Sequence, residues 1–252
     1  MLPVAVQAGL WGALAGAALL IGAAVAWFVR VPPRLVAAVM AFGSGVLISA
    51  VAFELVEEAY DGGGLAPTVA GFAAGAVVYS AANAALARRG AQHRKRSGDQ
   101  QSSESDTGGS GAALAVGALL DGIPESAVIG VSLLGGGGVG AATVIAIFIS
   151  NLPEGLSSAA GMKKAGRSPA YVFGIWGGIA LASGVAALAG YLGGEALGAA
   201  GVAALTAVAG GAILTMLTDT MIPEAVEGTR NETGLIAGAG FLTAFAIGQL
   251  GG

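Results

Sequence analysis

The sequence predicts an all-α polytopic membrane protein with eight transmembrane helices, and three observations lead to that prediction. The 252-residue chain is 55% hydrophobic and 10% charged, whereas soluble domains carry roughly 25% charged residues. Its apolar residues gather in long stretches that contain almost no charge. Its basic residues fall in alternate connections between those stretches, as in multi-pass membrane proteins.

Eight apolar stretches each approach the ~20 residues that a helix needs to cross about 30 Å of hydrocarbon. The first covers 5–29 and lacks a basic leader and an obvious cleavage site, so we expect a retained span and not a signal peptide. The other predicted spans are 33–54, 65–87, 111–134, 138–161, 169–192, 199–222 and 233–250.

The positions of the basic residues predict the orientation of the chain. All 11 Lys and Arg residues lie in or beside the first, third, fifth and seventh connections. The positive-inside rule places those connections in the cytoplasm and both termini on the extracytoplasmic side. We therefore expect a multi-pass protein of the plasma membrane that is surrounded by the lipid bilayer.

The segment 89–110 is the only long polar stretch, and it divides the chain. Its Ser, Gln, Gly and charge content is typical of a disordered loop, here cytoplasmic. Helices 1–3 would lie in 1–88 and helices 4–8 in 111–252, together forming one integral membrane domain. The chain has no cysteine, which excludes disulfides and thiolate metal sites.

Glycines four residues apart recur in three of the predicted spans. Small residues at that spacing let neighbouring helices approach closely. We therefore expect tight helix packing, with no particular dimer face assigned, at Gly12/Gly16, Gly71/Gly75 and Gly234/Gly238.

Two Pro-Glu phrases interrupt the fourth and fifth predicted spans, namely Asp121-Gly-Ile-Pro-Glu125 and Ser150-Asn-Leu-Pro-Glu154. A carboxylate at the bilayer centre costs about 2.5–3.5 kcal/mol, so it usually faces a partner, an ion or a water path. A proline inside a helix frees a backbone carbonyl and bends the helix. With a rise of about 1.5 Å per residue, both phrases lie roughly 10–20 Å from the inner ends of their spans, near mid-membrane.

These phrases supply an oxygen-rich set of side chains, and hard divalent cations prefer such ligands. The predicted metal site consists of Asp121, Glu125, Ser150, Asn151 and Glu154. The structural alternative is a pair of kinked helices whose protonated carboxyls bond to neighbours. The matched depth on two adjacent antiparallel spans favours a shared functional site.

Further acidic residues predict a cation route on either side of that site, because acidic vestibules concentrate cations. Glu54 ends the second span on the outer side, and Asp219 and Glu224 lie near the inner end of the seventh. Ordinary solvation of helix ends is the favoured interpretation for the neighbouring Glu57, Glu58 and Glu227.

Nothing in the chain predicts catalysis. It has no phosphate-binding glycine loop, no Ser-His pair and no nucleophile-base set, and its one histidine, His93, lies among basic residues. We therefore expect neither an enzyme nor a nucleic-acid partner, and no cofactor other than a divalent cation carried as substrate. An intramembrane enzyme would need a nucleophile or a metal-activated water beside a lipid-sized groove.

The eight spans, the outside termini, the polar loop and the Pro-Glu motifs resemble the ZIP (Zrt/Irt-like) metal transporters over nearly the whole chain. In that family the fourth and fifth spans commonly carry His-Asn-x-Pro-Glu-Gly, which the fifth span here matches at Asn151, Pro153, Glu154 and Gly155. The resemblance implies a ZIP-like bundle that imports zinc, iron or manganese through a site between helices 4 and 5. It also implies rocking of helix groups and frequent homodimers.

The motif departs from the family at its histidines, which are replaced by Asp121 and Ser150. Gly122 removes a further ligand position, and the sixth span lacks the glutamate that some members carry there. An aspartate in place of a nitrogen ligand shifts the preference toward manganese, iron or other harder ions. The alternative is a transport-inactive or regulatory ZIP-like protein in which the lost ligands mark lost function.

Overall fold

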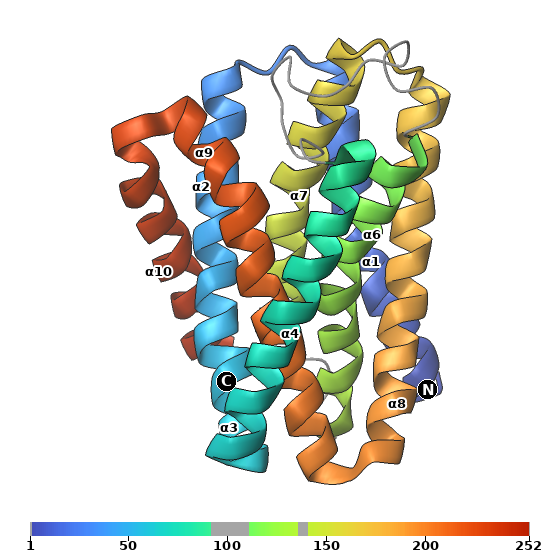
Figure 1. The fold of residues 1–252 in the computed structure, drawn as a ribbon, viewed down its shortest axis with the longest axis vertical. Coiled ribbons are helices and arrows are strands. Elements are labelled where there is room, and N and C mark those ends of the chain that lie inside the picture. The colour runs from blue at the N-terminus through green and yellow to red at the C-terminus, as the bar shows by residue number, and fades with distance from the viewer. Residues whose placement is uncertain (1, 92–110, 136–140, 252) are drawn as a thin grey trace.

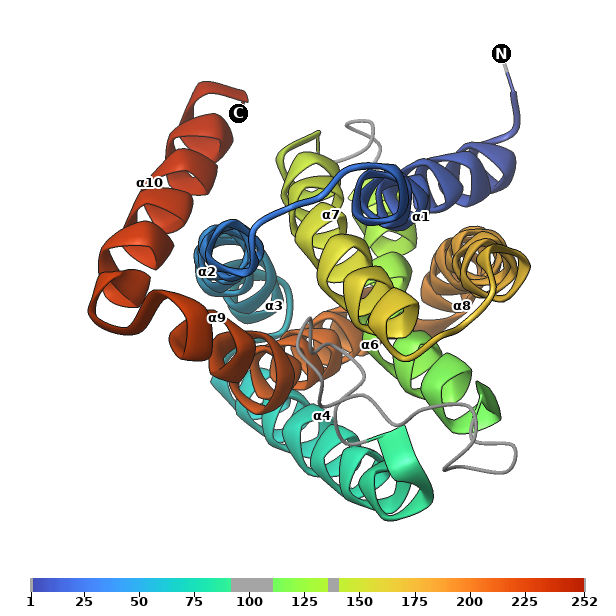
Figure 2. The ribbon, with the colours of Figure 1, turned by 90° about the horizontal axis from the view of Figure 1, so that it is seen from above.

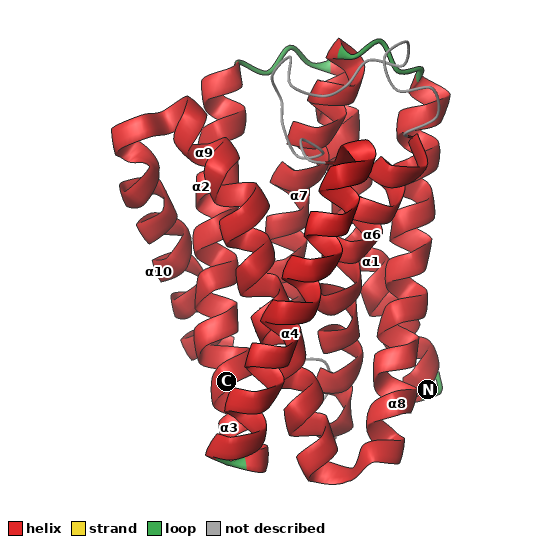
Figure 3. Cartoon of the chain, viewed as in Figure 1, coloured by secondary structure: helices red, strands yellow, loops and turns green. Residues whose placement is uncertain are grey.

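The computed structural model of the protein describes residues 2–91, 111–135 and 141–251, and within these ranges the chain is helical and has no strand (Figure 3). The long helices lie side by side along one axis of the molecule (Figure 1). Six of the helical segments are long and apolar enough to cross a membrane. The all-α class and the membrane-compatible helices are confirmed.

The first half of the chain follows the predicted spans closely. The second span continues past its predicted end without a break, through a π-helical segment into a further helix. The elements are α1 (Val4–Phe28), α2 (Pro33–Ala50), η1 (Val51–Val56), α3 (Glu57–Gly63), α4 (Leu65–Leu86) and η2 (Ala87–Ala91). Residues 89–91 of the predicted loop thus end a helix, and 92–110 lie outside the described residues.

The second half also matches the predicted helix positions, with two predicted spans merged into one element. The elements are α6 (Gly111–Val131), η3 (Ser132–Gly135), α7 (Ala141–Lys164), α8 (Pro169–Met216), η4 (Leu217–Met221), α9 (Ile222–Thr229), η5 (Arg230–Glu232) and α10 (Thr233–Gly251).

The merged element α8 contains a reversal of the chain. Gly198 inside it has φ 67° and ψ 175°, a backbone conformation that no helix contains and that glycine adopts without a steric penalty. Figure 1 shows the orange part of the chain turning back at the lower end of the bundle. Residues on either side of Gly198 therefore form two separate legs.

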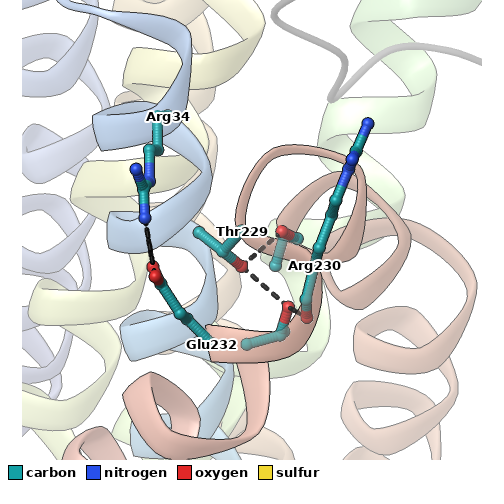
Figure 4. Close-up of polar contacts among 6 residues, drawn as sticks. Arg34, Thr229, Arg230 and Glu232 are labelled. Atoms are coloured by element: carbon teal, nitrogen blue, oxygen red, sulfur yellow. Dashed lines mark hydrogen bonds and ion pairs between the residues drawn. The ribbon is translucent and has the colours of Figure 1, made fainter.

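A second reversal joins α9 to α10 (Figure 4). Arg230 has φ 46°, the only positive φ of a non-glycine residue in the described chain. Thr233 Oγ1 donates to the carbonyl of Arg230 at 2.8 Å and lies 2.7 Å from Thr229 Oγ1. Both carboxylate oxygens of Glu232 accept from Arg34 Nη2, at 2.6 and 2.8 Å, which ties the turn to the start of α2.

The connections separate onto the two ends of the bundle. The α1–α2 and α7–α8 turns and η5 lie at one end, whereas both termini lie toward the other (Figure 1). The turns at the first end contain or adjoin basic residues, namely Arg30, Lys163, Lys164, Arg167 and Arg230. We refer to this end as the basic end.

The two helices that carry the Pro-Glu motifs differ in their main neighbours, and Figure 2 shows α7 beside α1. α6 packs mainly against α8, as does α4, whereas α7 packs mainly against α1 and α2. α1 contacts both α7 and α8 extensively, whereas the backbones of α6 and α7 approach each other closely at only a few positions. The two motif helices therefore depend on different neighbours for most of their packing.

Two of the three predicted glycine pairs pack closely. Cβ atoms on Gly12 and Gly16 would collide with α8 near Ser183, and those on Gly71 and Gly75 would collide with the backbone of the second leg of α8. Nothing lies within 4 Å of the Cβ positions of Gly234 and Gly238, so the prediction is wrong for this pair. Gly240 makes the close contact of α10 instead, against the backbone of Phe42.

Candidate metal site

All five predicted site residues are buried, although they lie on apolar helices. The exposed fractions are 1% for Asp121 and Glu125 on α6, and 1%, 5% and 4% for Ser150, Asn151 and Glu154 on α7. Pro124 and Pro153 lie inside helices that continue past them. Because residues four apart share a helix face, each helix presents two of these polar side chains on the same side.

Asp121 is held by a side chain from outside the predicted site. The hydroxyl of Tyr79 on α4, itself 1% exposed, donates to Asp121 Oδ1. Four residues further along α4, Asn83 Nδ2 donates to Asp219 Oδ2 at 3.2 Å. The signal in the sequence that could have indicated these contacts is the pair of polar side chains Tyr79 and Asn83, four residues apart in a largely apolar span.

Glu224 belongs to the buried set and not to an exposed mouth. It is 4% exposed on α9, and Ser157 Oγ on α7 donates to its Oε1 at 3.1 Å. Ser157 and Ser158 are 0% and 2% exposed, and they follow Glu154 on α7. Both serines lie outside the predicted site, and they extend the polar face of α7 toward the basic end.

The second position of each motif faces another helix. Asn151 Nδ2 donates to the carbonyl of Ala15 on α1 at 3.0 Å. A Cβ on Gly122 would lie 3.8 Å from Ser183 Oγ on α8. The glycine at position 122 thus adjoins a helix-helix contact, and Asn151 uses its amide nitrogen to join α7 to α1.

Other contacts on α7 fix the remaining motif residues. Ser150 Oγ donates to the carbonyl of Ile147 at 2.9 Å, one turn earlier in the same helix. A Cβ on Gly155 would collide with the backbone of Leu19 on α1. The glycine that closes the motif therefore allows α7 to lie directly against α1 beside Glu154.

The predicted route residues outside the two motifs differ in burial. Glu54, in the π-helical segment η1, is half-buried and accepts a hydrogen bond from Thr143 on α7. Asp219, in the π-helical segment η4, is exposed. Insertions of this kind within α-helices are frequent at functional sites, and η1 and η4 each contain an acidic residue.

A cavity of about 330 Å³ lies between α3, α6 and the turn of α8, at the end opposite the basic end. Glu58 and Thr206 line it. Thr206 is 1% exposed, and its Oγ1 has no hydrogen-bond partner. Glu58 therefore borders a hollow, and the interpretation of it as a merely solvated helix end is incomplete.

The carboxylates do not form a closed metal-binding cluster. Within the described ranges, no three His, Asp or Glu side chains lie close enough together to hold a metal ion. Any ion between α6 and α7 would need oxygens from Ser or Asn side chains, freed carbonyls or water, or a closer approach of the two helices.

The buried charges are strongly unbalanced. The four buried carboxylates of the described chain are Asp121, Glu125, Glu154 and Glu224. Arg167 is the only buried basic residue in the same ranges, and it lies in the turn after α7 at the basic end. Protons or cations must therefore offset much of the buried negative charge, since buried charges need compensation.

Comparison with known proteins assigns the chain to no family. No protein-family model matches it, and no curated protein matches it. Its function must therefore be inferred from the buried carboxylates and the helices that carry them.

Proposed function

We propose that the protein is a ZIP-like membrane transporter that moves a divalent cation of the zinc, iron or manganese class into the cytoplasm. The observation that carries the proposal is the burial of four carboxylates on α6, α7 and α9 with one buried basic residue, at the basic end. A divalent cation between α6 and α7 would neutralise two of these carboxylates at once. Such intramembrane acidic residues characteristically mark ion pathways.

Glu125 and Glu154 are the proposed core ligands, one from each motif helix. Asp121, Ser150 and Asn151 supplement them, and Glu224 receives the ion on the inner side, next to Ser157. This donor set consists of oxygens. Manganese and iron suit such ligands better than zinc, which favours sites that include nitrogen or sulfur.

The proposed topology has eight membrane crossings. Reversals at Gly198 and Arg230 divide the last long segment into three crossings, and the earlier segments supply five. An even number agrees with termini that lie toward the same end of the bundle (Figure 1). The positive-inside rule places the basic end in the cytoplasm and the termini outside.

The packing of the motif helices suggests how access to the ion could alternate. Glu125 lies on α6, which packs mainly against α8, and Glu154 lies on α7, which packs mainly against α1 and α2. A movement of α6 relative to α7 would change the separation of these carboxylates, and it would require the contacts of α1 with both α7 and α8 to rearrange. Glu54 on the outer side, with Asp219 and Glu224 on the inner side, would line the two halves of the route.

Metal uptake into liposomes tests the proposal directly. The purified protein is reconstituted with an internal metal-sensitive dye, and manganese, iron, zinc, cobalt and cadmium are added in turn. We expect Glu125→Gln and Glu154→Gln each to reduce uptake at least tenfold. Glu195→Gln is the matched control, because Glu195 is an exposed carboxylate at the turn of α8 that accepts from Tyr191 at 2.8 Å. Wild-type uptake of every metal by both motif variants would refute the proposal.

A transport-inactive or regulatory ZIP-like protein is the second candidate. The lack of a closed group of three acidic or histidine side chains in the described ranges favours it. Calorimetric titration of the purified protein separates the two candidates. Micromolar binding of a divalent ion, lost in Glu125→Gln, supports transport, whereas no binding by the wild-type protein supports the second candidate.

A further inference from the structure

We propose that the basic end carries a binding site for the phosphate group of an anionic phospholipid, formed where α1, α7 and α8 meet. This inference depends on the proposed membrane placement but not on metal transport. The site consists of a framework of aromatic rings, two cations held against those rings, and a further exposed arginine in the adjoining turn.

The aromatic framework joins the end of α1 to the start of α8. Trp27 and Phe173 meet edge to face, with ring centroids 6.2 Å apart, and Phe28 stacks on Phe173 at 6.1 Å. Phe28 belongs to this cluster, but its side chain is 78% exposed. Aromatic side chains at the ends of membrane helices typically lie at the level of the lipid head groups.

Two cations lie against aromatic rings here, one against the framework and one against the neighbouring Tyr171. Lys163 Nζ lies 5.4 Å from the centre of the Trp27 ring and donates to the carbonyl of Trp27 at 2.5 Å. The guanidinium of Arg167 lies 5.0 Å from the centre of the Tyr171 ring. An ammonium has three donors, so Lys163 can bond to phosphate oxygens while it keeps the Trp27 carbonyl. Because these contacts already position the side chains, less conformational freedom is lost when a ligand binds.

The segments that form the framework carry basic but no acidic side chains. Residues 1–53 and 155–194 contain no Asp or Glu, so neither α1 nor the ends of α7 and α8 at this site contribute an acidic side chain. The basic residues of these segments near the site are Arg30, Lys163, Lys164 and Arg167. Such a cluster beside membrane helices favours anionic head groups, which are concentrated in the cytoplasmic leaflet.

The start of α8 adds a further favourable electrostatic contribution. Ser168 caps this helix by accepting from the backbone N–H of Tyr171 at 3.2 Å, beside Arg167. The positive end of the helix dipole therefore lies next to the basic cluster.

The other side of the basic end differs in its charge. Arg34, at the start of α2, forms an ion pair with Glu232 at 2.6 Å (Figure 4). It therefore provides a matched control, an exposed arginine of the same end whose charge is already paired.

The test measures thermal stability of the full-length protein in neutral detergent during titration with phosphatidylglycerol or phosphatidylcholine. We expect phosphatidylglycerol to raise the unfolding temperature and phosphatidylcholine to have little effect. Lys163→Gln and Arg30→Gln, both at exposed positions, should each weaken the apparent affinity for phosphatidylglycerol at least threefold, and the double variant at least tenfold. Arg34→Gln should change it less than twofold.

Several results would overturn the inference: equal effects of the two lipids, an Arg34→Gln variant as weak as the double variant, or reversal of the lipid effect by millimolar inorganic phosphate. The last result would identify a free-anion site. Native mass spectrometry of retained lipid checks the same variants without relying on stability. Metal uptake is measured separately, so loss of lipid binding with intact uptake, or the reverse, shows which proposal has failed.

Discussion

Replacing Gly155 by alanine should disturb the contact between α1 and α7 beside Glu154. The new Cβ would lie 2.8 Å from Cα and C of Leu19, whereas carbon atoms pack best at about 3.5–4.0 Å. The helices would have to separate locally by about 1 Å. Overpacking of this kind costs about 1–3 kcal/mol, against a gain of about 1 kcal/mol from the higher helix propensity of alanine.

Gly174→Ala isolates the packing effect, because Gly174 lies in helix α8 with nothing within 4 Å of its Cβ position. Both variants receive the propensity gain, so their difference should equal the overpacking cost of about 1–3 kcal/mol. At roughly 2–4 °C per kcal/mol for a chain of this size, Gly155→Ala should unfold about 2–12 °C below Gly174→Ala. Tryptophan fluorescence during heating in detergent measures this gap. Equal unfolding temperatures would refute the close helix contact.

Three further substitutions test individual contacts. Tyr79→Phe removes the donor to buried Asp121 and should lower the free energy of unfolding by about 1.5–3 kcal/mol, measured by denaturant titration; an unchanged midpoint would contradict the contact. Ser157→Ala removes the donor to Glu224 and should cost about 1–3 kcal/mol in the same assay, and unchanged stability would contradict this hydrogen bond. Arg34→Gln breaks an exposed ion pair, so heating at low and high salt should show no measurable change in unfolding temperature.

The sequence predicted the helices well because their signals are local. Long apolar stretches follow Pro32, Gly64 and Ser168, and the helices α2, α4 and α8 begin directly after these residues. The reversal at Gly198 was predicted as a gap between spans, and its positive φ explains why glycine occupies that position. The extension of α2 through η1 was not predicted, because no local signal marks a π-helical insertion.

The candidate site was predictable only in part. A carboxylate after a proline in an apolar span is visible in the sequence, and all five predicted residues are buried. The direction that each side chain takes depends on which helices are neighbours. Asn151 bonds to α1, and Tyr79 reaches Asp121 across 42 positions of sequence. Neither contact could be derived from spacing along one helix.

The sequence by itself determined the all-helical, membrane-compatible class, the positions of the long helices and the acidic residues placed within them. It could do so because hydrophobicity, helix length and charge act over a few turns of a single helix. Only the tertiary structure decided that α6 and α7 have different main neighbours, that Glu224 is buried while Asp219 is exposed, and that Lys163 lies against Trp27. Those outcomes depend on close approaches between distant segments, which small residues such as Gly22 and Gly155 permit but do not by themselves specify.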